Sequence, residues 1–307
     1  MVDDSLDGAI RSALFTFLDG LKERYPTGIP QREINRFVFQ GENIKPLLQQ
    51  GIRKVAGLST ALVFYTTYTS PSADAPYNDH VGADGFLRYK WQGDDPNRSV
   101  NSAMRSAIRT GAPLVYFHGV ADAVYAALYP AFIIDEEQDQ KQFVIAFEEA
   151  PVVSGGASVP APLRRYNQRL TRYRLHQPIF RRRVLDAYRN ACAVCRLAEV
   201  RLLDAAHIIG DGLEGGDPEV SNGLAMCKIH HAAFDQHIIG VRPDDFMVQV
   251  QPSIMEQSGD LMLQYGLQAM HGRILQLPRM KGSHPSTSRL ERRFREFLER
   301  GDANAAA

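Results

Sequence analysis

The chain places all its sulfur ligands in one short stretch. Its three cysteines lie between residues 192 and 227 of a 307-residue sequence. Cys192 and Cys195 form a C-x2-C pair, Cys227 and His230 form a C-x2-H pair, and 31 residues lie between the two pairs. Two ligand pairs on tight turns are typical of a tetrahedral zinc site. Because three sulfurs and one nitrogen fill the coordination shell, we expect this zinc to be structural.

Buried free cysteines that behave as small hydrophobic residues are the alternative. That alternative does not explain why two regular ligand pairs stand on either side of a polar loop. The zinc site is therefore the preferred interpretation.

The polar residues between and after these pairs could carry chemistry of another kind. The run LLDAAHII predicts a strand, so His207 points to one face and Asp204 and Ala206 to the other. A glycine-rich loop with Asn222 follows, and CKIHHAAFD predicts the start of a helix. His231 and Asp235 are four residues apart and share a helical face. An imidazole and a carboxylate at this spacing can hold a hard divalent cation.

His207, Asn222 and His231 together resemble the His-Asn-His signature of the HNH nucleases, which have the ββα-metal fold. The resemblance covers about residues 181–242. It is most specific for the members whose fold is held by a cysteine-rich zinc site. The chain is similar to bacterial modification-dependent HNH restriction endonucleases, so the resemblance implies phosphodiester hydrolysis in DNA.

The resemblance also implies a role for each matching position. His207 matches the general base, whose near-neutral pKa suits removal of a proton from water. Asn222 matches the central asparagine, which either braces the loop or touches the metal. His231 matches the metal-binding histidine, and Asp235 falls where many members have a second ligand. A carboxylate there favours Mg²⁺ or Mn²⁺ as the catalytic ion.

The sequence departs from the family at one position. Many members have a metal-binding Asp or His directly before the catalytic histidine, where this chain has Ala206. We expect Asp204, on the same strand face, to take that place. Two alternatives stay open: His207 as a core histidine bonded to the backbone, and Asp235 as a partner of an arginine.

A basic segment precedes the zinc ligands. The formal net charge is zero, so no global field points to nucleic acid or membrane. Between residues 161 and 200, however, ten arginines stand against Asp186 and Glu199. Arginine matches phosphate geometry, so we predict DNA contacts from Arg181, Arg182 and Arg183. A solvated helix face is the alternative.

The sequence before this segment predicts a separate domain. Apolar spacing predicts a helix over 5–24, and short Val-, Phe- and Tyr-rich runs between 36 and 149 predict strands. One helix is expected among them, over 101–111, closed by Gly111. The run PVVSGGASVPAP (151–162) predicts a linker. The basic segment after it favours a helix interrupted by Pro178, and a final helix is expected over 288–300.

Polar loops of this first domain carry candidate recognition residues. An aromatic cage closed by a carboxylate could hold a flipped base. The candidates are Tyr68, Tyr77, Asp79, Asp84, Tyr89 and Trp91. The run ADGFLRYKW is similar to the Asp-Gly region of SRA readers, which implies a PUA/SRA-like barrel. Ordinary strand packing is the alternative, because Tyr89 and Trp91 share one face and Arg88 and Lys90 the other.

Together these observations predict an α+β protein with a target-recognition domain over 1–155 and an HNH endonuclease domain over 156–307. We expect a cytoplasmic enzyme that acts on modified double-stranded DNA as a homodimer. The sequence shows no signal peptide and no run of ~20 apolar residues. The alternatives are a nuclease released by a ligand or partner, and an inactive zinc module that only binds DNA.

Overall fold

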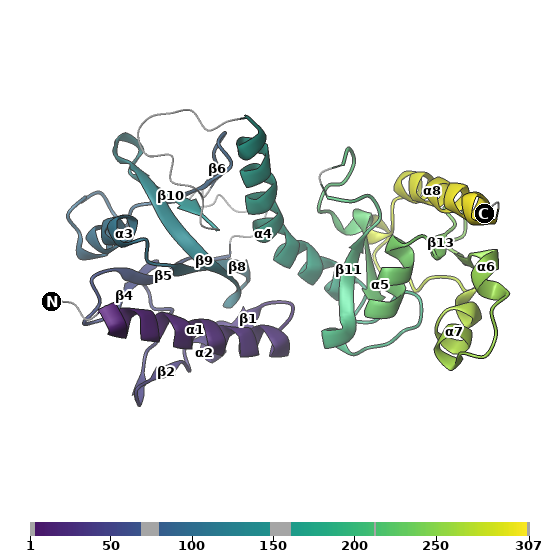
Figure 1. Ribbon diagram of the computed structural model, residues 1–307, viewed down its shortest axis with the longest axis horizontal. Coiled ribbons are helices and arrows are strands. Elements are labelled where there is room, and N and C mark those ends of the chain that lie inside the picture. Colours follow the sequence, from purple (N-terminus) through teal and green to yellow (C-terminus); the bar gives the residue numbers. More distant parts are fainter. Residues whose placement is uncertain (1–3, 69–79, 148–160, 212, 306–307) are drawn as a thin grey trace. The chain divides into compact units, whose positions relative to one another are not determined.

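A computed structural model describes residues 4–68, 80–147, 161–211 and 213–305 of the chain (Figure 1). The chain divides into two compact units, residues 1–178 and 179–307. The predicted boundary at 155/156 lies outside the described residues and stays a prediction. Among the helices that are described, none is long and apolar enough to cross a membrane.

The first unit is built on one mixed sheet. Its order is β4-β5-β8-β9-β10-β7-β6, with β1 paired to β9. Among the strands that the structure describes, only β5 and β8 run parallel. The strands are β1 (Ile29–Pro30), β4 (Ile52–Lys54), β5 (Ala61–Thr66), β6 (His80–Val81), β7 (Leu87–Lys90), β8 (Leu114–Ala121), β9 (Val124–Glu137) and β10 (Gln142–Ala146). A short hairpin, β2 (Val38–Phe39) and β3 (Glu42–Asn43), and helix α2 (Gln31–Ile34) stand outside this sheet.

Helices cover both faces of the sheet. On β8, Leu114 and Tyr116 belong to one buried cluster and Val115 and Phe117 to another, as expected for a strand buried on both sides. Helix α3 (Ser99–Thr110) contributes to the first cluster, and α1 (Asp4–Arg24) contributes to the second. Both predicted helices are confirmed, and Gly111 adopts φ 65° at the end of α3, a left-handed conformation that favours glycine.

The predicted α+β class is confirmed. The sheet is curled, but the chain of paired strands begins at β4 and ends at β6, and no pairing between those two is found in the part that the structure describes. The predicted PUA/SRA-like barrel therefore stays a prediction.

Helix α4 (Ala161–Ala187) corrects the expected interruption at Pro178, because it continues through that residue. Pro178 removes one backbone hydrogen bond of the helix. Contacts of the helical turns before and after it offset this loss. Before Pro178, Leu175 joins the core of the first unit and the Thr171 hydroxyl donates to the Gly85 carbonyl at 2.7 Å. After it, Phe180 and Val184 belong to the core of the second unit.

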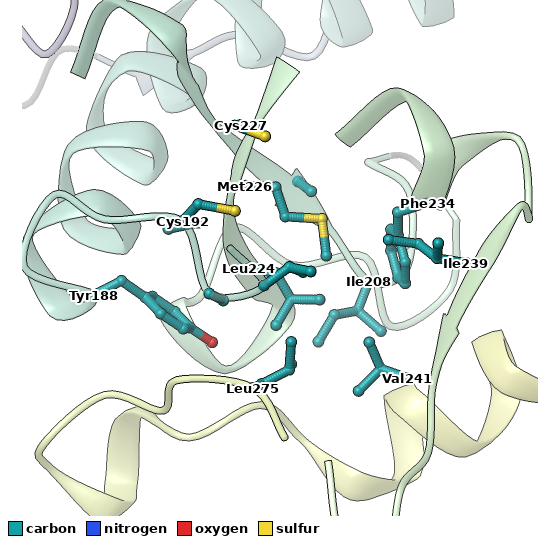
Figure 2. Close-up of a cluster of buried hydrophobic side chains, with 14 of the residues drawn as sticks. Tyr188, Cys192, Ile208, Leu224, Met226, Cys227, Phe234, Ile239, Val241 and Leu275 are labelled. Atoms are coloured by element: carbon teal, nitrogen blue, oxygen red, sulfur yellow. The ribbon is translucent and has the colours of Figure 1, made fainter. Parts of the chain in front are cut away.

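The second unit contains a ββα arrangement. Strands β11 (Leu203–His207) and β12 (Gly223–Cys227) pair antiparallel, and α5 (Lys228–Asp235) follows directly. A second hairpin, β13 (Ile239–Val241) and β14 (Val248–Val250), and helices α6 (Pro252–Met255), α7 (Leu261–Gly266) and α8 (Thr287–Ala305) complete the unit. Figure 2 shows its core, where Leu224 and Met226 of β12 lie near Ile208, Phe234 and Val241. The predicted strand, the helix after Cys227 and the final helix are confirmed.

Candidate functional site

The four predicted zinc ligands converge. One donor atom from each of Cys192, Cys195, Cys227 and His230 lies within 4.8 Å of the others. His230 Nδ1 is 3.1 Å from Cys227 Sγ and 3.6 Å from Cys192 Sγ. Three sulfurs and one imidazole nitrogen at this spacing form a donor set that suits a tetrahedral soft metal ion.

A further contact fixes the His230 ring. Its Nδ1 faces the sulfurs, and its Nε2 donates to the Gly266 carbonyl at 2.8 Å, at the end of α7. Metal-binding histidines commonly donate their second nitrogen to a carbonyl, which sets the tautomer and the ring orientation. The His230 environment therefore fits a metal ligand and ties α7 to the cysteine group.

Asp204 lies at the centre of a charged network on the ββα unit. Its Oδ1 accepts from Arg181 at 2.6 Å and from Lys228 Nζ at 2.8 Å, and its Oδ2 lies 2.7 Å from Lys228 Nζ. Burial alone would raise the pKa of Asp204. The hydrogen bonds from His231 and Lys228 and the charges of Lys228 and Arg181 lower that pKa well below its ordinary value.

His231 stands between two carboxylates. Its Nδ1 is 3.4 Å from Asp204 Oδ2, and its Nε2 is 3.3 Å from Asp235 Oδ2. Asp204 and Asp235 therefore face opposite nitrogens of the His231 ring. A metal ion bound to one ring nitrogen would have only one of these two carboxylates beside it. Within the described ranges, the group of three or more potential ligands whose donor atoms lie close enough to share one metal ion is the cysteine–histidine set.

His207 ends β11 and stacks on Phe180 of α4. The ring centroids are 4.0 Å apart and the planes differ by 14°. His207 Nε2 is buried and has no hydrogen-bond partner among the described residues. If His207 were only a core histidine, we would expect its ring nitrogens to hydrogen-bond the backbone. Its Nε2 makes no such bond within the described part of the chain. Burial, the largest cause, lowers the pKa of His207, while the charges of Asp211 and Asp235 raise it.

Asn222 is fully buried and braces the loop after His207. Its Oδ1 accepts from the Ile209 amide at 2.9 Å, and its Nδ2 donates to the carbonyls of Ile209 and Asp217, each at 3.0 Å. Of the two roles that the resemblance allowed, bracing is the one that this geometry displays.

The comparison with known families agrees with this geometry. Residues 192–242 match the family described as HNH endonuclease, and this range contains the four proposed zinc ligands and the signature residues His207, Asn222 and His231. This part of the chain is an HNH endonuclease domain. The predicted family and the predicted enzyme class, a metal-dependent nuclease, are confirmed.

No curated protein matches the chain. Two solved structures are similar to it. One, "Modification dependent TagI restriction endonuclease", is 18% identical with a TM-score of 0.32, over 80% of this chain and 85% of that chain. The other, "Structure of the Type IV phosphorothioation-dependent restriction endonuclease ScoMcrA", is 14% identical with a TM-score of 0.24, over 80% of this chain and 57% of that chain.

The three arginines predicted to bind DNA have different surroundings beside the HNH domain. Arg181 is bound to Asp204 and also donates to the Leu203 carbonyl. Arg182 lies 3.7 Å from Asp186, and Arg183 is exposed. Arg181 therefore holds α4 to β11, and the predicted DNA contacts of Arg182 and Arg183 stay predictions.

The candidate recognition residues are dispersed. Tyr77 and Asp79 lie outside the described residues, and Tyr68 is 37% exposed. Asp84 binds Arg88 at 2.7 Å. Tyr89 and Trp91 are buried in a core cluster, and the Tyr89 hydroxyl donates to backbone carbonyls. The burial of Tyr89 and Trp91 favours ordinary strand packing for these two residues, because their rings are not exposed enough to stack on a base.

Sequence reasoning missed two residues of the HNH domain. Lys228 could have been suspected, because it follows Cys227 and precedes the histidine pair on the same short helix. Phe180 carried no signal, since its stacking on His207 joins segments 27 residues apart.

Proposed function

We propose that this chain is a modification-dependent DNA endonuclease in which the HNH domain cuts and the N-terminal domain selects the target. The carrying observation is the HNH match over 192–242, whose His207, Asn222 and His231 lie on one ββα unit. The zinc-binding remnant without catalysis is the weaker alternative, since the base and a histidine–carboxylate pair are both retained.

His207 is proposed as the general base. Its lowered pKa keeps the imidazole neutral at cellular pH, and a neutral imidazole can take a proton from water. Phe180 holds the ring plane, and Asn222 holds the loop that follows. These contacts would orient the base for in-line attack on a phosphodiester.

His231 and a neighbouring carboxylate are proposed to hold Mg²⁺ or Mn²⁺. The donor set of one imidazole nitrogen and the carboxylate beside it fits these hard ions. Such an ion neutralises the charge that grows on the phosphate and on the leaving 3′ oxygen. Cys192, Cys195, Cys227 and His230 are proposed to hold a structural Zn²⁺.

The partners follow from the reaction. Double-stranded DNA is the proposed substrate, and Arg183, whose side chain is exposed, is proposed to contact the backbone phosphates together with Arg182. A double-strand cut needs two active sites, so a homodimer is proposed. The modification reader is placed over 1–155, supported by the similarity of ADGFLRYKW to the SRA Asp-Gly region. A cytoplasmic location goes with this function.

Plasmid cleavage with Mg²⁺ or Mn²⁺ tests the proposal. The substrates are unmodified, cytosine-methylated, hydroxymethylated and phosphorothioated DNA. His207→Ala is compared with wild type and with His176→Ala, a matched control at an exposed histidine of the first unit. We expect one modified substrate to be cut, with the rate reduced at least about 100-fold in His207→Ala alone.

Each outcome decides one part of the proposal. Equal cutting of every substrate would keep the nuclease and remove the modification reader. No cutting by wild type with zinc bound would favour a triggered nuclease or a binding module. Loss of zinc in His207→Ala would show that its effect on cutting is structural.

A further inference from the structure

We propose that Asp204 is a positioning residue and not a metal ligand: it fixes the tautomer of His231 so that Nε2 binds a divalent ion together with Asp235. The inference deepens the proposed function, because it rests on the metal dependence of the HNH domain. It also replaces the expectation that Asp204 substitutes for the ligand missing at Ala206.

The oxygens of Asp204 are already occupied. Arg181 contacts Oδ1 at 2.6 Å, and Lys228 contacts Oδ1 at 2.8 Å and Oδ2 at 2.7 Å. A divalent ion at this carboxylate would have to displace two positive side chains or lie beside both. Arg181 cannot leave easily, because it is held at the same time by strand and turn carbonyls. The network therefore neutralises Asp204 without metal.

The contact between Asp204 and His231 selects one tautomer. An ionised carboxylate can only accept hydrogen bonds, so His231 must present a proton at Nδ1 to Asp204 Oδ2, 3.4 Å away. A neutral imidazole carries a single ring proton. Its Nε2 therefore keeps a lone pair, which is the form that binds a metal ion.

That lone pair faces Asp235. His231 Nε2 and Asp235 Oδ2 are 3.3 Å apart, and two lone pairs at this distance need a proton or a cation between them. Adjacent ligands of an octahedral ion with bonds of about 2.1 Å lie about 3.0 Å apart, close to the distance here. Asp235 is half-exposed, and the Arg293 guanidinium stands 3.9 Å from its Oδ1. Water can therefore fill further coordination positions.

Asp204, His231 and the ion would form a carboxylate–histidine–metal series, in which the carboxylate orients the ligand.

The isosteric substitution Asp204→Asn tests the tautomer. Arg181 and Lys228 both donate to the Oδ1 position, which favours the amide oxygen there. The amide nitrogen then takes the place of Oδ2, where the second Lys228 contact is lost, and donates to His231 Nδ1. The zinc-loaded full chain, with ¹⁵N-labelled histidine, is measured by long-range ¹H–¹⁵N NMR before and after Mg²⁺. Mn²⁺ affinity is measured by electron paramagnetic resonance. Lys228→Gln is the matched control, because it removes a cation from Asp204 and keeps the carboxylate.

In wild type and Lys228→Gln we expect the Nδ1–H tautomer, with Mg²⁺ shifting Nε2. In Asp204→Asn we expect the Nε2–H tautomer and Mn²⁺ affinity lower by about 10- to 100-fold, with one ion still bound at saturation. Asp235→Asn should keep the tautomer and lose more affinity than Asp204→Asn. An Nε2–H tautomer in wild type, a Mg²⁺ shift at Nδ1, or loss of the bound ion in Asp204→Asn at saturation would overturn the inference.

These readouts separate the inference from the proposed function. If the chain binds Mn²⁺ with the expected tautomers and cuts no DNA, the nuclease proposal fails and the role of Asp204 stands. If it cuts DNA while His231 carries its proton on Nε2, the reverse holds.

Discussion

Asn222 shows how one buried amide can set the shape of a catalytic loop. It satisfies the amide and carbonyl of Ile209, two residues beyond His207, and the carbonyl of Asp217 across the loop. Three backbone groups depend on this side chain, and the two from Ile209 are in buried hydrogen bonds. The residue therefore acts on the base by fixing the path of the chain around it.

Replacing Asn222 with Ala should destabilise the second unit by about 3 kcal/mol, because buried backbone groups would lose their partners. Urea unfolding of the full chain measures this. Ser221→Ala is the neighbouring control, since its hydroxyl makes contacts only at the partly exposed surface, and should cost less than about 1 kcal/mol. If Asn222→Ala were as stable as that control, the loop would not depend on the amide.

The pH dependence of cleavage should report the His207 environment. Its pKa is lowered from the ordinary value of 6.5, chiefly by burial. The neutral, base-competent form therefore persists to lower pH than for an exposed histidine. With saturating Mn²⁺, the rate at pH 6.5 should exceed half of its plateau, and the acid limb should lie below pH 6.5. An acid limb centred above pH 7 would contradict this assignment.

At the scale of elements, the position of His207 depends on how α4 packs against the β11–β12 hairpin. Gly223 pairs with His207 across the hairpin and lies against Val184 and Phe180 of α4. A Cβ added at Gly223 would enter the Val184 side chain and come within 3.0 Å of the Phe180 ring. The glycine thus permits a close approach between strand and helix, and the approach brings Phe180 onto the His207 ring.

Gly223→Ala should therefore push α4 from the hairpin, cost about 1–3 kcal/mol of stability and lower the cleavage rate. Gly210→Ala is the matched control, because its added Cβ would meet only Leu213 at an ordinary 3.7 Å. Denaturant unfolding and single-turnover cleavage measure the two effects. Equal effects of the two substitutions would show that the close packing at Gly223 has no special role.

The elements also show which parts of the site could be predicted from sequence. Ligand pairs at fixed spacing, such as Cys192 with Cys195, are local and were read correctly as a converging group. The surroundings of Asp204 could not be predicted in this way, because Arg181 reaches it from α4 and Lys228 from α5. Periodicity gives the face of a strand but does not show which side chains arrive from other elements. The strand order of the large sheet could not be predicted for the same reason. Strand β5 pairs with β4, its neighbour in sequence, but also with β8, which is distant in sequence.

At the scale of the whole molecule, the chain has two units with separate hydrophobic clusters. The metal-sized cysteine group belongs to the second unit and is surrounded by the core of that unit. The single tryptophan of the chain, Trp91, is buried in the first unit. Tryptophan fluorescence therefore reports unfolding of the first unit, while far-UV circular dichroism reports both.

Removing Cys227, one of the proposed zinc ligands, should separate the two transitions. In Cys227→Ser the second unit loses the free energy of metal binding and the link from His230 to α7. A loss of about 3 kcal/mol would lower its melting temperature by roughly 10 °C. The Trp91 transition should stay at its wild-type temperature, and zinc content measured by mass spectrometry should fall to zero. A Trp91 transition that moved with the second would show that the units unfold together, and an unchanged second transition without zinc would show that the cysteine group does not support the fold.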